Sequence, residues 1–484
     1  MKISLNSIVK FLWAAALVTL PVASFRWFPF LGDDTLVRPM ALYPLALLLP
    51  LLLIQWIRGE RPFAWTGSAI LLAVFTVAVL TAASFGVLID PLPMRGQTYS
   101  GRVLRALVTL VIGLVFFISS AWMNRDEDEV RFTLKWLLVG FCLDLAWSGV
   151  QAVTFYTHLL KKEMVTHWQL LFSMRELVKT NRVSGLAYEP AWLAGQIATT
   201  YLPVLFAAIL TKTRITRLRW LEPVLLALAA LLLLATYSRG GILIGLGAAV
   251  VTFLVFGRDL LRATWTWFFG GFRGSALHLA LRLGMIAVLI GVMVGGVAFL
   301  SRKNYFRRLW ESTATNLNQY LIDINAGARS AYAVGAMGAY DQHPILGVGL
   351  GASGFWIYNN LPDWTQTTVP EIARQLDPTS KLYPNPKDLY VRLLAETGLV
   401  GFALFLIFML SSFGDALSLL RRGNFWYFLG IAGFFAWLAI ALYNVTQDSF
   451  ATPNIWVIPG ILAGISSILS PLIPRPKDEG EEIS

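Results

Sequence analysis

Residues 220–257 read WLEPVLLALAALLLLATYSRGGILIGLGAAVVTFLVFG. Two apolar runs, 220–237 and 240–257, are joined by a hinge that contains Arg239 between a serine and two glycines. Each run is long enough for an α-helix to cross a bilayer, and a hinge this short forces the second helix to return beside the first. The stretch therefore predicts a hairpin of two membrane-spanning helices.

The same apolar pattern recurs along the whole chain. Its 484 residues are 56% hydrophobic and 14% charged, with a mean hydropathy of +0.63. A soluble chain of this length would divide into roughly two or three domains with polar surfaces. We therefore expect an all-α polytopic membrane protein with about twelve spans. The predicted spans are 8–28, 41–57, 65–88, 103–122, 135–157, 189–211, 220–237, 240–257, 282–301, 388–411, 425–446 and 454–471.

Composition excludes several other classes of protein. The single cysteine, Cys142, rules out an intramolecular disulfide, and the four histidines are too scattered for a zinc site. The net charge of +11 suggests nucleic acid, but basic cytoplasmic loops explain it better in a membrane protein. We therefore expect no metal, no cofactor and no nucleic-acid partner.

One connection is much longer than the others. Residues 302–388 form a polar segment between two spans, and a loop of this length usually binds something. Long translocated loops count little in the positive-inside rule, so both termini read as cytoplasmic, and this loop and that near 158–188 lie outside. The chain then divides into nine spans (1–301), the partly helical outer loop, three spans (389–471) and a tail (472–484). Within the outer loop, helical spacing predicts helices at 305–321 and 326–341.

Charged residues at the ends of spans are candidates for chemistry, because they are costly in a membrane unless paired or functional. Glu189 precedes Pro190 at the start of a span. An acid there either stabilises the helix N-terminus or serves as a partly desolvated base. Arg239, beside two glycines, either extends into water or clamps a phosphate.

Other charged residues have simpler structural interpretations. Arg392 and Glu396 are four residues apart on one helix and can pair with each other. Asp144 lies within a span and can bond a neighbouring helix. His343 precedes a proline, where it either caps a turn or acts as a base.

Four stretches, taken in order, resemble one known family. The sequence reads RVSGLAYEPAWLAGQ at 182–196 and SRGG at 238–241. Arg329 is then followed by HPILGVGLG at 343–351 and LYVRLLAETGLVG at 389–401. Their order and spacing are similar to those of the O-antigen ligase/polymerase superfamily, over roughly residues 180–402.

The resemblance implies a GT-C-like glycosyltransferase of the bacterial inner membrane whose active site faces the periplasm and needs no metal. Its donor would be a glycan on undecaprenyl diphosphate. Polymerases pass the glycan to another lipid-linked repeat unit, whereas ligases pass it to lipid A–core. Ligases tend to carry a His-Asn pair before the tenth span, where this chain has Lys387-Asp388. We therefore expect a polymerase of O-antigen or exopolysaccharide, with membrane lipids and a chain-length regulator as candidate partners.

Such a transfer needs cations for the departing diphosphate and a base for the acceptor hydroxyl. Arginine suits the diphosphate, because its planar fork binds phosphate oxygens in pairs. We predict that Arg239 and Arg329 hold the diphosphate and that Arg182 assists. Tyr188 and Lys387 are predicted to contact the substrate as well. Glu189 is the first choice of base, followed by His343 and Asp388.

Transport is the competing class, because a protein with this many spans could flip lipid-linked glycans. Transporters often have paired halves with matching broken helices near the midplane. The sequence shows no such pairing, and its polar residues are concentrated in one outer loop. This distribution favours chemistry at the membrane surface.

Overall fold

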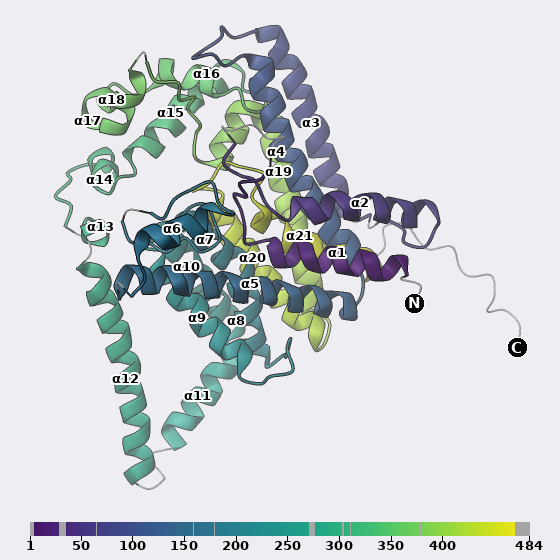
Figure 1. Ribbon diagram of the computed structural model, residues 1–484, viewed down its shortest axis with the longest axis vertical. Helices are drawn as coiled ribbons and strands as arrows, with labels where there is room; N and C mark the ends of the chain where they lie inside the picture. The colour runs from purple at the N-terminus through teal and green to yellow at the C-terminus, as the bar shows by residue number, and fades with distance from the viewer. Residues whose placement is uncertain are drawn as a thin grey trace, which may run out of the picture.

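The computed structural model describes residues 4–28, 35–63, 65–157, 159–178, 180–270, 276–302, 304–309, 311–377 and 379–469 (Figure 1). Over these residues the chain is helical, and isolated β-bridges are the sole strand-like pairing. The prediction of an all-α multi-pass protein is confirmed for this part of the chain. The predicted tail at 472–484 lies outside the described residues.

Among the described helices, seven are long and apolar enough to cross a membrane, judged by length and composition. These are α3 (Gly67–Ile89), α4 (Tyr99–Met123), α5 (Glu127–Tyr156), the continuous run of α7 (Pro190–Gln196), η2 (Ile197–Tyr201) and α8 (Leu202–Thr211), α10 (Arg239–Phe256), α19 (Leu389–Leu420) and α20 (Phe425–Tyr443). Five further apolar helices lie in the other predicted spans: α1 (Leu5–Thr19), α2 (Leu42–Ile57), α9 (Leu221–Ala235), α12 (Ala276–Ser301) and α21 (Val457–Leu469).

The first predicted span, 8–28, was wrong at its C-terminal end. The helix α1 ends at Thr19, and Pro21 follows, which has no N–H group to continue it. The chain then runs extended, with Phe25 N donating to Arg38 O at 2.8 Å. Apolar composition alone could not distinguish this buried extended segment from helix.

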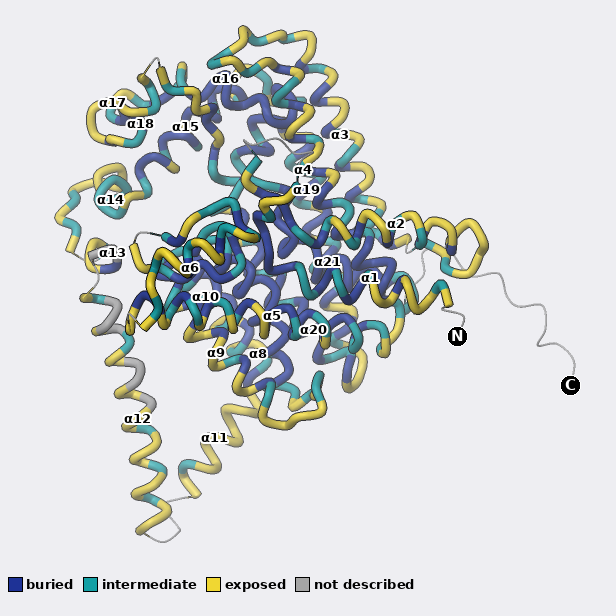
Figure 2. Tube along the Cα trace, in the orientation of Figure 1, coloured by how far each residue is buried: buried dark blue, intermediate teal, exposed yellow. Residues whose placement is uncertain are grey.

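The C-terminal spans lie among the N-terminal ones (Figure 1). The helix α19 packs against α3 and α20, α21 packs against α4, and α20 also packs against α8 and α10. Their contact faces form a continuous apolar core rich in aromatic side chains, of which Phe405, Phe435 and Trp456 are fully buried. The buried centre of the tube in Figure 2 follows these helices. This core fixes the ends of the spans, which carry the candidate site.

The predicted hairpin is present as α9 and α10. Tyr237 turns the chain with φ +47°, and the Ser238 hydroxyl accepts a hydrogen bond from Gly241 N at the start of α10. A Cβ on Gly241 would lie 2.3 Å from the Cβ of Ala194 in α7. Glycine is therefore required there, and it lets the hairpin turn approach the start of α7.

Beyond the hairpin, α11 (Arg258–Gly270) and α12 project from the body (Figures 1 and 2). The chain returns to the hairpin at α13 (Asn304–Arg307), where the rings of Phe306 and Tyr237 lie 6.4 Å apart. The large loop thus begins beside the hairpin turn.

The large loop is built from short helices. The predicted helix at 326–341 is confirmed as α15, but the single helix predicted at 305–321 was wrong. That region holds two short helices, because Asn316 ends the intervening turn by capping α14 through Gln319 N. The loop packs as a second core against the ends of α3, α4 and α19. Its helices after α13 are α14 (Leu317–Asp323), α15 (Gly327–Gln342), α16 (Gly354–Ile357), η4 (Tyr358–Asn360), α17 (Trp364–Thr368) and α18 (Pro370–Leu376). The other outer loop holds α6 (Lys162–Leu170).

A break in α19 locks the large loop to the spans. Gly398 has φ +61° and ψ −167°, which interrupts the helix and exposes backbone groups. The run that follows His343 pairs with them: Gly349 N donates to Glu396 O at 2.8 Å, and Leu399 N donates to Pro344 O at 2.8 Å. The two glycine-rich sequence stretches therefore form one structural junction.

Candidate functional site

The hairpin turn between α9 and α10 is contacted by groups from two loops, 158–188 and 302–388. Arg182 donates through Nε to the Thr236 carbonyl at 2.9 Å, which holds the 158–188 loop against the turn. Arg239, the first residue of α10, donates through Nη2 to the Ile324 carbonyl of the large loop. Two of the predicted diphosphate ligands are therefore held at one turn.

Arg329 reaches the same neighbourhood from α15. Its Nη1 donates to the Thr446 carbonyl at 2.9 Å, in the loop that joins α20 to α21. The Thr446 methyl group lies 3.7 Å from the position that a Cβ on Gly240 would take. Thr446 therefore contacts both the residue after Arg239 and the guanidinium of Arg329. The three predicted arginines come from separate segments: Arg182 and Arg239 lie at the hairpin turn, and Arg329 bonds Thr446, which contacts that turn at Gly240.

Glu189 lies directly before α7, as predicted, but its carboxylate does not cap that helix. Instead Oε1 accepts a hydrogen bond from Arg175 Nη1 at 2.6 Å. The same guanidinium lies over the ring of Tyr188, 4.9 Å from its centroid. Sequence reasoning missed Arg175, because nothing in its surroundings distinguishes it from the other basic residues of that loop.

A polar face of α5 fixes the loop that carries these residues. Gln151 is fully buried, and its Oε1 accepts from Ser184 N at 3.0 Å and from Gly185 N at 2.9 Å. Its Nε2 donates to the Gly185 carbonyl at 3.1 Å and to Gln169 at 2.7 Å. Asp144, seven residues earlier, accepts from Leu186 N at 2.8 Å. The interpretation of Asp144 as structural holds, but its partner is the Leu186 amide of a loop and not a neighbouring helix, as the sequence had suggested.

Tyr443 connects Glu189 with Arg329. The phenol packs directly on Gly195 of α7, where an added Cβ would lie 2.7 Å from the hydroxyl oxygen. It also lies within electrostatic reach of Arg329, Glu189 and Asp448. The predicted base and a predicted diphosphate ligand therefore share this buried neighbour.

Lys387 and Asp388 form a second group beside the 444–448 loop. Asp388 caps α19 by accepting from Tyr390 N at 2.9 Å and Val391 N at 3.1 Å. Burial raises the pKa of Asp388, and Asp448 raises it further, whereas the two capping amides lower it. Lys387 N donates to Asp448 Oδ2 at 3.2 Å. Asp448 is a charged residue that the sequence interpretation passed over, although it is a lone acid in a short loop after a span.

Lys387 has a charged partner of its own. Its Nζ lies 3.0 Å from Glu371 Oε1 and 5.0 Å from the centroid of the Tyr332 ring. The position predicted for substrate binding is thus tied to α18 of the large loop.

Arg392 and Glu396 form the predicted ion pair, at 2.8 Å. Glu396 also accepts from Gly351 N at 2.6 Å and from the Ser353 hydroxyl at 2.7 Å. With side chains only 9% and 1% exposed, the pair is committed to holding the glycine-rich run in the break of α19. The structural interpretation of this couple is confirmed.

His343 lies apart from the arginines. It follows the last residue of α15, whereas Arg329 lies in the first turn, so about 21 Å of helix separates their backbones. Its ring packs near Phe85 and Trp356, with centroid distances of 6.1 and 6.3 Å. The structure does not bring His343 together with Glu189 and Arg329.

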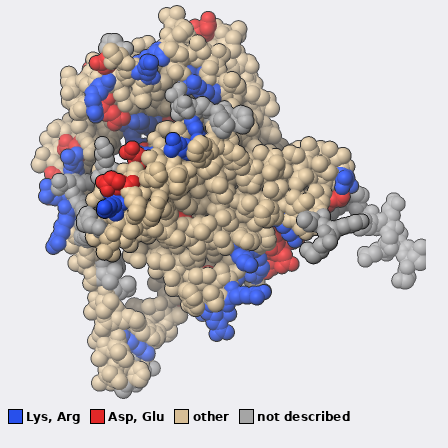
Figure 3. Space-filling model, viewed as in Figure 1, with Lys and Arg blue, Asp and Glu red and all other residues tan. Residues whose placement is uncertain are grey.

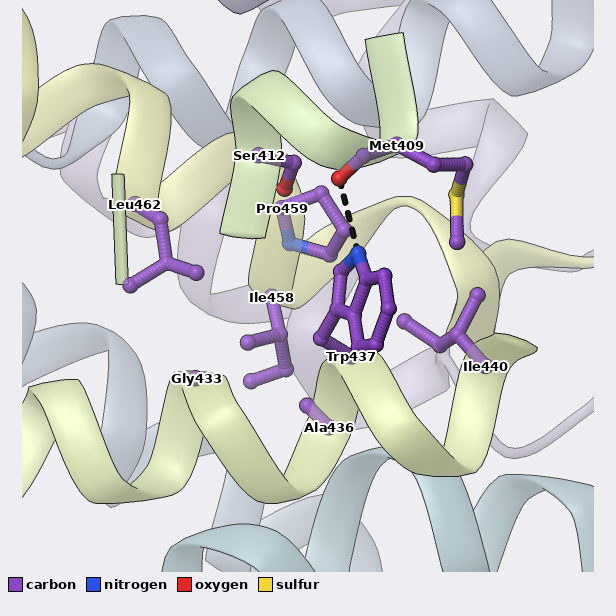
Figure 4. A pocket seen from close by; sticks show the side chains of 9 residues that line it. All are labelled: Met409, Ser412, Gly433, Ala436, Trp437, Ile440, Ile458, Pro459 and Leu462. Atoms are coloured by element: carbon purple, nitrogen blue, oxygen red, sulfur yellow. Dashed lines mark hydrogen bonds between the residues drawn. The ribbon is translucent and has the colours of Figure 1, made fainter. Parts of the chain in front are cut away.

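Figures 3 and 4 show a hollow at the surface and a cavity inside the molecule. Figure 3 shows a hollow between the lobe that contains α14 and α15 and the body below it, with basic and acidic side chains along its rim. Figure 4 shows a second, internal cavity among α19, α20 and α21, beside the 2.7 Å bond from Trp437 Nε1 to the Met409 carbonyl. No titratable side chain lines that cavity, which makes it a packing gap. Among the described residues, no group of three or more His, Cys, Asp or Glu is placed to hold a metal ion.

Comparison with known protein families gives a match over part of the chain. Residues 224–406 match the family model described as O-antigen ligase. The match begins within α9 and ends within α19, so it includes Arg239 and Arg329. The loop that carries Arg182 and Glu189 precedes it. No curated protein matches the chain. The resemblance to the O-antigen ligase/polymerase superfamily is confirmed, and it suggests membrane glycan transfer of the ligase or polymerase type.

Proposed function

Since residues 224–406 match the O-antigen ligase family, we propose that the protein is a glycosyltransferase that polymerises lipid-linked glycans. The substrate is an oligosaccharide repeat unit on undecaprenyl diphosphate, and the product is O-antigen or exopolysaccharide. The reaction takes place at the periplasmic face of the bacterial inner membrane, on a GT-C-like scaffold. Basic short loops on the opposite side support this orientation.

One observation carries the proposal: Arg182, Arg239 and Arg329 come from separate segments and meet around the hairpin turn and the 444–448 loop. A diphosphate leaving group gains negative charge as its bond to the sugar breaks. Fixed guanidinium groups stabilise that charge without rearranging. We propose that these arginines replace the metal ion that many glycosyltransferases use.

Glu189 is the proposed base. In the proposed step, the acceptor hydroxyl oxygen forms a bond to the anomeric carbon of the donor sugar. The bond from that carbon to the diphosphate oxygen breaks, and its electron pair leaves with undecaprenyl diphosphate. The hydroxyl proton passes to the Glu189 carboxylate. Asp388 is the second candidate base, and its capping bonds to α19 make it less mobile.

Reconstitution tests this proposal. Purified protein in proteoliposomes, with lipid-linked repeat units in the outer leaflet, is expected to make polymer. Glu189→Gln and Arg239→Lys are each expected to lower the rate by about 10²-fold, because each removes a group used in the transition state. A flippase would move the substrate between leaflets without lengthening it. Normal polymer from Glu189→Gln would exclude Glu189 as the base.

The ligase alternative follows from the description of the matching family. Here Lys387 pairs with Glu371 and Asp388 caps α19, at the position where ligases tend to carry a His-Asn pair. The lipid-linked species that accumulate without the protein decide between the two. Single repeat units indicate a polymerase, and full-length chains on the carrier indicate a ligase.

A further inference from the structure

The Arg175–Glu189 ion pair can open so that Arg175 exchanges the carboxylate for another anion. The two side chains are 34% and 41% exposed, so water screens their attraction. A diphosphate carries more negative charge than one carboxylate and accepts paired hydrogen bonds from a guanidinium. It therefore competes effectively with Glu189 for Arg175.

The backbone of Arg175 is fixed while its side chain is held only by this pair and by a ring. The Arg175 carbonyl accepts from Gln169 Nε2 at 2.9 Å, and its N–H donates to the Ser173 hydroxyl at 3.2 Å. Gln169 is itself held by the buried Gln151. The guanidinium also lies over the Tyr188 ring, 4.9 Å from its centroid, and a guanidinium held over a ring can still form in-plane bonds to phosphate oxygens.

The ion pair also engages one carboxylate oxygen of Glu189, the proposed base. Oε1 of Glu189 already accepts the Arg175 proton at 2.6 Å, so a sugar hydroxyl has to compete for that oxygen. Glu189 and Arg329 both interact electrostatically with Tyr443, and Arg175 belongs to the same loop as Arg182, one of the cations proposed to bind the donor.

From these contacts we infer that Arg175 is a further diphosphate ligand, which Glu189 holds until the donor binds. The donor takes Arg175 from Glu189, and the released carboxylate becomes available to the acceptor hydroxyl. Donor binding and release of the base are then one event. This inference rests on the proposed function.

Binding of undecaprenyl diphosphate to the protein in lipid nanodiscs tests it without turnover. Arg175→Gln is expected to weaken binding about tenfold, because it removes charge-assisted hydrogen bonds. Glu189→Gln is expected to tighten binding about two- to fivefold, because it releases Arg175 from a half-exposed pair. In the Arg175→Gln background, Glu189→Gln should no longer tighten binding. A purely structural ion pair would not produce these opposite signs.

Arg131 and Glu127 provide a matched control. They pair at 2.7 Å with 38% and 43% exposure, at the far end of α5, so Arg131→Gln and Glu127→Gln should leave binding unchanged. Unchanged or weakened binding in Glu189→Gln would overturn the inference. If Arg239→Gln lowers binding and Arg175→Gln does not, only this inference fails. If the wild-type protein does not bind the lipid, the proposed function fails as well.

Discussion

Two ion pairs of almost equal length separate the structural region of this protein from the region that we propose to be reactive. Arg392 and Glu396 lie 2.8 Å apart and are 9% and 1% exposed, whereas Arg175 and Glu189 lie 2.6 Å apart and are 34% and 41% exposed. Distance does not distinguish them. Burial and the number of additional partners do.

The buried pair is fully committed. The Glu396 carboxylate accepts hydrogen bonds from Arg392, Gly351 and Ser353. Moving it would therefore leave charges unpaired in the interior. The outer pair gives up little when it opens, because water can replace either partner. Charged residues at the junction in α19 therefore hold the loop in place, whereas the Arg175–Glu189 pair can open to a ligand at lower cost.

The largest effect is expected at the buried pair. Glu396→Gln leaves Arg392 without its counter-charge, and breaking a buried pair costs about 3–5 kcal/mol. The unfolding temperature in detergent should fall steeply. Glu311→Gln is the control, since its pair with Arg307 is 2.8 Å long but 55% and 51% exposed, and it should have no measurable effect. A Glu396→Gln protein with normal stability and no activity would reverse the comparison, making the junction catalytic.

A smaller effect is expected where the hairpin meets α7. Gly241→Ala places a Cβ 2.3 Å from that of Ala194, and such overpacking costs about 1–3 kcal/mol. It also pushes Arg239 away from the start of α7, so polymer synthesis should fall more than the amount of folded protein. Gly247→Ala, on the same helix with nothing within 4 Å of its added Cβ, should retain full activity. Equal activity in both variants would show that the turn does not set the site.

The comparison also explains what the sequence could predict. Apolar runs located the spans, since burial in lipid imposes a length and a composition on each helix. The hairpin was predicted from its glycines, and the Arg392–Glu396 pair from its helical spacing. The break at Gly398 was beyond local pattern, because it exists only through backbone bonds to the run after His343.

The site was only partly predictable for the same reason. Arg182, Arg239 and Arg329 were chosen one at a time by residue type, and their placement around the hairpin turn depends on how distant segments pack. Arg175 and Asp448 had no local signal strong enough to single them out. His343 attracted attention because histidine is a common base, yet its place at the end of α15 separates it from Arg329.

A pH-dependent effect is expected at Asp388, which lies between the two regions. Burial raises its pKa in the folded protein, so the unfolded chain loses this proton first as the pH rises. Its contribution to stability is present below the ordinary aspartate pKa of about 3.9 and is lost as the pH rises through the raised value. The unfolding temperature of wild type should therefore fall relative to Asp388→Asn across that window. Asparagine still caps α19, so a constant difference between the two proteins would show that Asp388 is not perturbed.

The smallest effect is expected at His343, and it tests the comparison most directly. His343→Phe keeps a ring beside Phe85 and Trp356, so stability should change by no more than about 0.5 kcal/mol. About 21 Å of α15 separates this residue from Arg329, so polymer synthesis should stay within about twofold of wild type. The measurement is polymer yield per folded protein, beside Glu189→Gln in the same preparation. If both variants lose polymer equally, the reacting sugars extend along α15 to its far end. The boundary between the structural and the reactive region would then lie beyond the glycine-rich run, because His343 directly precedes it.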